Sequence, residues 1–300
     1  MLGPVPRGLW LGGTVTEQPF ARVVRLAEVG STSTALREAV AADPGAWPHL
    51  SALVAGHQTA GRGRTGRSWL TPPGSALTAS ILLRPQVPLE RAPWLTLLAG
   101  LAAVRAVRRG GGDRAGAVGL KWPNDLLVDD AGPALAGWGT ARKLGGILTE
   151  LLPPAPDGRP TAVVGIGVNL SQDAAALPVA SATSLALAGV PVPAPEALLD
   201  AVGRALGGLV RRWEEHDGDA RAAGLLTEVA ADCLTLGRDV RVEQPGGGVL
   251  HGRAEALDDD GCLRVRDTRG VLHRVLAGDV LHVRADTGSA DAGTDVNLEL

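Results

Sequence analysis

The sequence has few of the residues that mark secreted and membrane proteins. Tyrosine is absent, phenylalanine and methionine occur once each, and cysteine occurs only at Cys233 and Cys262. Two cysteines are too few for the disulfide framework of a small extracellular domain. No apolar run approaches the roughly 18 residues that cross a bilayer, and the first residues lack the basic-then-apolar order of a secretory signal. These absences predict a cytoplasmic protein without a membrane partner.

An excess of charge of one sign is also missing. The 300 residues carry a formal net charge of -3, with 45% hydrophobic and 20% charged residues. Proteins that bind duplex nucleic acid usually present a concentrated basic face, so this balance argues against a DNA partner. The length is sufficient for one large domain, or for one with a small companion.

Lysine and asparagine are scarce. Of 29 basic residues only Lys121 and Lys143 are lysines, and asparagine occurs only at Asn124, Asn169 and Asn297. The codon bias of a GC-rich genome explains the general loss of both residue types. An ammonium is a compact point charge, whereas a guanidinium is a planar fork. If drift has replaced most lysines by arginine, we expect the two that remain to stand where a guanidinium would not serve.

The order of hydrophobic segments predicts an α+β fold with a mixed sheet. Residues 90–109 and 195–216 carry apolar stripes at spacings of three and four, and residues 31–43 begin with hydroxyl residues that supply helix N-caps. Short apolar runs predict strands at 23–26, 51–56, 76–85, 145–152 and 161–170, with a strand, a turn and a second strand at 119–128. Helices and strands do not alternate strictly, which favours a mixed rather than a parallel sheet.

The hydrophobic pattern of the sequence changes near Cys233. Short, often alternating segments separated by glycine-bearing turns follow, as is typical of a small β-barrel. We therefore expect a lead-in at residues 1–20, a mixed-sheet domain at 21–232, a β domain at 233–284 and a disordered tail at 285–300.

Arginine and glycine alternate in residues 57–69, HQTAGRGRTGRSW. Glycine lets the backbone approach a ligand closely, and arginine forks hold carboxylate or phosphate oxygens. The segment therefore suits a mobile loop that encloses an anionic ligand. A solvated basic turn and an Arg-Gly segment that binds RNA are alternatives on the arginines alone. Against the RNA alternative, the segment lies between two predicted buried strands rather than in a low-complexity tail.

Three further segments carry candidate polar residues. In KWPND, Lys121 could pair with phosphate, Trp122 could pack on a ring and Asp125 could bind Mg²⁺. An ordinary hairpin turn with the tryptophan anchored in the core explains the same residues. KLGGILTE places Lys143 before two glycines and a strand, which also fits a solvated edge charge. GIGVN puts two glycines inside an apolar strand, where something must approach closely, and ends on Asn169.

In their order and in their residues, these segments resemble the motifs of the biotin–protein ligase family. The family pattern of a Ser-Thr pair, QTAGRGRxGRxW, KWPND, KxxGIL and GxGxN is present from about residue 23 to residue 283. The resemblance implies a catalytic domain of the biotin/lipoate-ligase type followed by an SH3-like domain. It also implies the activity, in which biotin and ATP with Mg²⁺ form biotinyl-5′-AMP and pyrophosphate. Biotin is then transferred to one lysine of the biotin carboxyl carrier domain of an acyl-CoA carboxylase.

The resemblance also assigns roles to individual residues. Lys143, Arg64 and Lys121 are expected to be catalytic, and Asp125 to bind Mg²⁺. Biotin is expected to contact Ser31, Thr32, Ser33, Gln58, Arg62, Gly63, Arg64 and Lys143. ATP and the adenylate are expected to contact Arg62, Arg64, Arg67, Trp69, Lys121, Trp122, Asn124 and Asn169. Ser33 stands where a common family pattern has asparagine, so its contact with biotin would involve a shorter side chain.

Rival functions remain to be distinguished. Some members of the family carry an N-terminal helix-turn-helix that binds DNA, but the residues before Val23 show no such pattern, so we expect a ligase without a repressor arm. Lipoate–protein ligases share the adenylation chemistry but lack the GRGRxGRxW and KWPND motifs. A nucleic-acid-binding module and a catalytically inactive biotin sensor are further alternatives. The sequence leaves the oligomeric state open.

Overall fold

The computed structural model describes residues 18–129, 131–136, 138–155, 157–244, 248–276 and 279–283. The predicted tail at 285–300, and all but residues 18–20 of the predicted lead-in, lie outside the described residues. Within them, no helix has the length and apolar character needed to cross a membrane.

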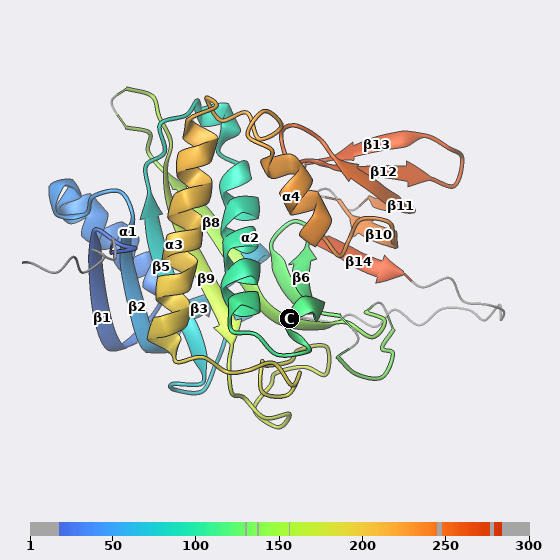
Figure 1. Ribbon diagram of the computed structural model, residues 1–300, viewed down its shortest axis with the longest axis horizontal. Helices are drawn as coiled ribbons and strands as arrows, with labels where there is room; N and C mark the ends of the chain where they lie inside the picture. Colours follow the sequence, from blue (N-terminus) through green and yellow to red (C-terminus); the bar gives the residue numbers. More distant parts are fainter. Residues whose placement is uncertain are drawn as a thin grey trace, which may run out of the picture.

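A seven-stranded mixed sheet forms the body of the molecule, as the hydropathy pattern predicts (Figure 1). The first two strands are parallel and every other pairing in the sheet is antiparallel. In spatial order the strands are β1 (Arg22–Val29), β2 (Ser51–Gln58), β5 (Ala76–Leu83), β9 (Thr161–Asn169), β8 (Arg142–Leu152), β7 (Asp125–Val128) and β6 (Val118–Lys121).

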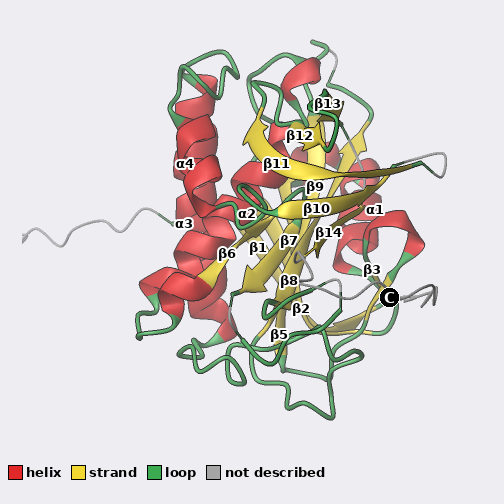
Figure 2. Cartoon of the chain, turned by 90° about the vertical axis from the view of Figure 1, so that its right-hand side faces the viewer, coloured by secondary structure: helices red, strands yellow, loops and turns green. Residues whose placement is uncertain are grey.

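Side-chain alternation divides this sheet into an apolar face and a face that carries polar groups. In β5, Leu77, Ala79, Ile81 and Leu83 join the main core beneath α2 (Trp94–Arg109) and α3 (Pro195–Glu214). Leu82 packs instead against α1 (Thr32–Ala42), in a smaller cluster on the other face. Figure 2 shows α1 on the opposite side of the sheet from α2 and α3. Ser80, two residues before Leu82, therefore points toward the start of α1.

The helices begin where local chemistry allows. Ser31 is the N-cap of α1, and its hydroxyl accepts a hydrogen bond from the Thr34 amide at 3.4 Å, as the hydroxyl-rich start predicts. A fourth helix, α4 (Leu225–Asp232), was not predicted. Four single turns of 3₁₀-helix are η1 (Pro44–Ala46), η2 (Arg64–Gly66), η3 (Leu89–Arg91) and η4 (Ala115–Ala117). The Arg-Gly segment forms a small hairpin of β3 (Gly61–Arg62) and β4 (Ser68–Trp69) around η2.

The C-terminal part is a five-stranded antiparallel sheet, as predicted. Its spatial order is β13 (Leu272–Val275), β12 (Leu263–Asp267), β11 (Val249–Leu257), β10 (Asp239–Glu243) and β14 (Asp279–Val283). Its buried valines belong to the same apolar cluster as the first sheet, so the two parts share one core. The indole of Trp94 donates a hydrogen bond to the carbonyl of Asp259 at 2.6 Å, which fixes the second sheet to α2.

Candidate active site

A cavity of about 790 Å³ opens between the first sheet, the Arg-Gly hairpin and the C-terminal sheet. Every predicted site residue except Trp122 lines it: Ser31, Thr32, Ser33, Gln58, Arg62, Gly63, Arg64, Arg67, Trp69, Lys121, Asn124, Asp125, Lys143 and Asn169. Predicted site residues up to 138 positions apart in the sequence thus meet at one place. Of the C-terminal sheet, Arg241, Glu243 and Val280 border the same cavity.

One end of the cavity is a buried chain of hydroxyl and amide groups. Gln58 Oε1 accepts hydrogen bonds from the backbone amide of Thr32 at 2.7 Å and from its hydroxyl at 2.9 Å. Ser80 donates to Thr32 Oγ1 at 2.8 Å, and the Ser80 and Ser33 hydroxyls are 2.9 Å apart. Sequence reasoning missed Ser80, although its even position in β5 places it on the face that carries Leu82. The chain of bonds fixes each hydroxyl, so this end can present oriented donors and acceptors to a polar ring.

The two glycines of GIGVN admit the close approaches that the sequence predicts. A Cβ at Gly165 would lie 2.8 Å from Ser33 Oγ, and one at Gly167 would lie 2.6 Å from the Trp69 ring. The Trp69 ring therefore lies directly on β9 and forms part of the cavity floor. Its Nε1–H is buried and has no hydrogen-bond partner among the described residues, so a ligand acceptor would satisfy it.

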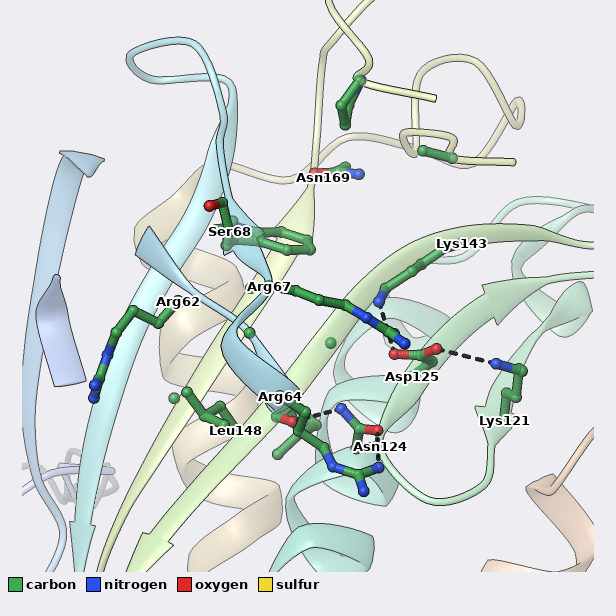
Figure 3. A pocket seen from close by; sticks show the side chains of 18 of the residues that line it. Arg62, Arg64, Arg67, Ser68, Lys121, Asn124, Asp125, Lys143, Leu148 and Asn169 are labelled. Carbon is green, nitrogen blue, oxygen red and sulfur yellow. Dashed lines mark hydrogen bonds and ion pairs between the residues drawn. The ribbon is translucent and has the colours of Figure 1, made fainter. Parts of the chain in front are cut away.

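The centre of the cavity holds a buried carboxylate between two lysines. Lys143 Nζ lies 2.9 Å from Asp125 Oδ1, and Lys121 Nζ lies 3.3 Å from Asp125 Oδ2 (Figure 3). Burial alone would raise the pKa of Asp125, but the ammonium groups of Lys143 and Lys121 outweigh it and lower this pKa to about 2. The carboxylate is therefore ionised at neutral pH and holds both ammonium groups at the cavity surface.

The backbone of Lys143 is paired on both sides, whereas the backbone of a lysine on an edge strand is paired on one side only. Its amide donates to the Ser181 carbonyl at 2.7 Å, and its carbonyl accepts from the Thr183 amide at 2.8 Å. On the other side of β8, Lys143 pairs with Leu127 of β7. The lysine thus projects from a strand that is supported along both edges.

The expected magnesium role of Asp125 stays a prediction. In this structure both of its carboxylate oxygens face ammonium groups. Mg²⁺ that accompanies a nucleotide takes most of its ligands from phosphates and water, so one carboxylate beside the two lysines is compatible with the expected role.

The three arginines of the hairpin point in different directions (Figure 3). Arg67 extends toward the pair formed by Lys143 and Asp125. Arg64 donates to Asn124 Oδ1 at 3.0 Å, while Asn124 Nδ2 donates to the Ile147 carbonyl at 2.9 Å. The hairpin is thereby attached to the turn of KWPND across the cavity.

The chain is similar to biotin–protein ligases in sequence and in fold. Residues 29–170 match the Biotin/lipoate A/B protein ligase family, and residues 235–283 match the Biotin protein ligase C terminal domain. The biotin--[acetyl-CoA-carboxylase] ligase of Mycobacterium tuberculosis is 35% identical over 260 residues, which cover 86% of this chain and 88% of that protein. The chain belongs to the biotin–protein ligase family.

Two further comparisons agree with this membership. The biotin--[acetyl-CoA-carboxylase] ligase of Paracoccus denitrificans is 32% identical over 250 residues, covering 82% of this chain and 94% of that protein. The biotin protein ligase of Aquifex aeolicus, solved in complex with biotin and ATP, superposes with a TM-score of 0.67 at 26% identity. That superposition covers 89% of this chain and all of the other. The fold expected from the resemblance, a mixed-sheet catalytic domain with a small C-terminal β domain, is confirmed.

Two residues that we expected to contact ligands have protein partners in this biotin–protein ligase family member. Trp122 is 2% exposed and does not line the cavity; its Nε1 donates to the Gly261 carbonyl at 2.9 Å, so the ring anchors the C-terminal domain. The hairpin-turn alternative describes this residue correctly. Arg62 borders the cavity, but its guanidinium donates to Glu150 Oε1 at 2.6 Å and points away from Lys143 (Figure 3). Arg37 donates to the same oxygen at 2.9 Å, so Arg62 attaches the hairpin to α1 and β8.

Asn169 supports the cavity wall from within. Its Nδ2 donates to the Thr183 carbonyl and its Oδ1 accepts from Gln172 Nε2, both at 2.9 Å. These bonds hold the segment that pairs with Lys143, and the expected contact of Asn169 with the nucleotide stays a prediction. Trp138, between β7 and β8, was not among the expected residues and also lines the cavity.

Proposed function

We propose that this chain is a biotin–[biotin carboxyl-carrier protein] ligase. It would activate biotin with ATP as biotinyl-5′-AMP and then transfer the biotinyl group to one lysine of a carrier domain. The observation that carries the proposal is the cluster of Lys143, Lys121 and Asp125 at the centre of a cavity whose far end is lined by ordered hydroxyls. Family membership identifies the reaction for which such an arrangement is suited.

The first step brings together two anions. A carboxylate oxygen of biotin attacks the α-phosphorus of ATP, the new C–O–P bond forms, and pyrophosphate leaves with the electrons of the broken P–O bond. Positive groups held in place before the reaction lower the repulsion between the reactants and stabilise charge on the phosphoryl oxygens. Lys143, Lys121 and Arg67 face this region, and a cavity partly closed to water strengthens their effect.

Asp125 has a defined part in this step. A lone lysine on a flexible stem has many positions, whereas here one carboxylate holds two ammonium groups on its two oxygens. When substrate anions enter, the ammonium groups can turn to them without being brought from solvent. For the Mg²⁺ expected to accompany ATP, Asp125 is the carboxylate beside the phosphate region that would serve as its protein ligand.

The second step requires an enclosed intermediate. The mixed anhydride reacts with water, so the cavity must remain covered until the acceptor lysine arrives. The Arg-Gly hairpin is in place for this, because Arg64 attaches it to Asn124 on one side and Arg62 attaches it to Glu150 on the other. The acceptor amine then attacks the biotinyl carbonyl carbon, AMP leaves, and the amine loses a proton.

The acceptor and the location follow from the same reasoning. The relatives from Mycobacterium tuberculosis and Paracoccus denitrificans are named for acetyl-CoA carboxylase, which supports a carboxylase carrier domain as the partner. ATP is a cytoplasmic substrate, and the two cysteines are free and buried. We therefore place the reaction in the cytoplasm.

Pyrophosphate release tests the proposal. The purified chain with ATP is expected to release pyrophosphate when biotin is added, with a burst of one equivalent in the absence of acceptor and turnover when a biotin carrier domain is present. Lipoate in place of biotin tests the lipoate-ligase alternative, and a gel-shift assay with single-stranded RNA tests the nucleic-acid alternative. Release with lipoate but not with biotin, or RNA binding without release, would overturn the proposal.

A further inference from the structure

The loop between β7 and β8 supplies an aromatic surface to the cavity. Trp138 lines the cavity and lies half-buried, and the Lys121 ammonium is over its ring, 5.0 Å from the centroid. That distance is within the range of a cation–π contact. Since Lys121 also faces Asp125, its ammonium lies between a carboxylate and an indole ring.

The described residues of this loop, 131–136 and 138–141, are held by hydrogen bonds. Arg142 is 5% exposed, and its guanidinium donates to the carbonyls of Gly139 at 3.2 Å and of Pro133. The Trp138 amide donates to the Leu135 carbonyl at 3.0 Å, closing a turn. A buried guanidinium that satisfies loop carbonyls is costly to displace. The hydrogen bonds of Arg142 and of the Trp138 amide therefore hold Trp138 at the cavity.

The position of the ring indicates its ligand. Lys121, which touches the ring, is one of the cations that face the phosphate region. In a nucleotide the base is joined to the phosphates through a single ribose, so a flat apolar surface beside the phosphate cation is within reach of the base. Ala136 and Val280 border the same cavity and add apolar surface. Phosphates that draw the Lys121 ammonium away would uncover the ring face for a base.

We propose that Trp138 contacts the purine ring of ATP and sets the affinity of the enzyme for the nucleotide. This assignment rests on the proposed function and adds to it a purine-contacting residue from the loop between β7 and β8. Stacking of a base on an aromatic side chain is favourable and tolerates sequence differences, because every base has a flat face. Trp138 is therefore a binding residue for the base, and Lys121 and Lys143 remain the groups for the phosphates.

Steady-state kinetics of pyrophosphate release test the assignment. W138A is expected to raise KM for ATP about tenfold or more, with KM for biotin within about twofold of the wild type. W138F keeps a flat ring and is expected to recover most of the loss. L135A removes an aliphatic side chain of the same loop that does not line the cavity, and it should match the wild type. Far-UV circular dichroism checks that each variant is folded.

Competitive inhibitors separate a base contact from an effect on Lys121. Adenosine carries only the base and ribose, so its inhibition should weaken in W138A, whereas inhibition by tripolyphosphate should be unchanged. An unchanged KM for ATP in a folded W138A or W138L variant would overturn the assignment, as would equal loss of adenosine and tripolyphosphate inhibition. Failure of the proposed function itself is distinct, because then the wild type would release no biotin-dependent pyrophosphate.

Discussion

Both lysines of the chain meet at a single carboxylate. Lys121 and Lys143 are 22 positions apart in the sequence, yet their ammonium groups pair with the two oxygens of Asp125. Codon bias accounts for the arginines elsewhere, but it gives no reason for two lysines to coincide in space. Each ammonium meets one Asp125 oxygen as a compact point charge, whereas a guanidinium is a planar fork.

Substitution of Lys143 should remove catalysis and leave the fold. K143A is expected to lower the rate of adenylate formation by at least a hundredfold, and K143R is expected to be nearly as slow, because a guanidinium does not reproduce the point charge. Rapid-quench measurement of biotinyl-AMP formation gives the rate directly. R109A changes an exposed cation at the end of α2 and serves as the control. Retention of a tenth of the rate in K143A, about 1.4 kcal/mol of barrier, would contradict the assignment.

Ionised Asp125 should make stability depend on pH in acid. Its pKa is about 2 in the folded protein against 3.8 as the ordinary value. Between these values the unfolded chain binds the proton first, so the stabilisation is complete above about pH 4 and is lost as pH falls toward 2. The loss amounts to about 2 kcal/mol at most.

Urea unfolding from pH 5 down to the lowest pH at which both proteins stay folded measures this effect. D125N carries no titrating group at this position, so its free energy of unfolding should fall less steeply with decreasing pH than that of the wild type. Equal slopes for the two proteins would show that the carboxylate is not held by the lysines.

At the scale of elements, strand β9 shows what a sequence pattern can and cannot reveal. Two glycines inside an apolar strand predict close approach, and the structure confirms it at Gly165 and Gly167. The approaching groups, Ser33 and the Trp69 ring, come from segments about 100 or more residues away in the sequence. The two glycines in the sequence indicate that another group lies close to the strand, but only the folded structure shows which group it is.

A methyl group at Gly167 should displace the Trp69 ring from the cavity floor. A Cβ there would lie 2.6 Å from the ring, which is too close for any real contact, so the ring must shift. G167A is expected to lower kcat/KM for biotin at least tenfold in the pyrophosphate assay, with a Tm within a few degrees of the wild type. G116A is the matched control, because a Cβ at Gly116 would meet no atom within 4 Å. Equal activity of G167A and the wild type would mean that the ring takes no part.

The Arg-Gly hairpin should lose its hold on the intermediate when Arg64 is removed. R64G breaks the hydrogen bond to Asn124 and is expected to release biotinyl-AMP, which then labels bystander proteins such as serum albumin. N124A should show the same effect more weakly, and the double variant should be no worse than R64G if the bond is what matters. Anti-biotin blotting of mixtures measures the labelling. An R64G protein that still labels only the carrier domain would contradict this account.

At the scale of the whole molecule, the cavity depends on both sheets. The sequence predicts α1, α2, α3, the strands of the first sheet and the small β domain, because apolar periodicity and turn residues are local signals; it misses α4. It offers a Trp122 anchored in the core only as an alternative, since the two hydrogen-bond acceptors of Trp122, Thr235 Oγ1 and the Gly261 carbonyl, come from more than 100 residues away. The ion pair of Arg62 with Glu150 and the contact of Trp138 with Lys121 also join residues that are distant in the sequence, so no local pattern predicts them.

The most direct test of the account is the mass of the acceptor after reaction. A biotin carrier domain incubated with this chain, biotin and ATP should gain one biotinyl group on one lysine, as read by intact mass and peptide mapping. The same mixture with K143A, or without ATP, should leave the carrier unmodified. A carrier that remains unmodified with the wild-type chain, or that gains a lipoyl group in preference to biotin, would contradict the central claim.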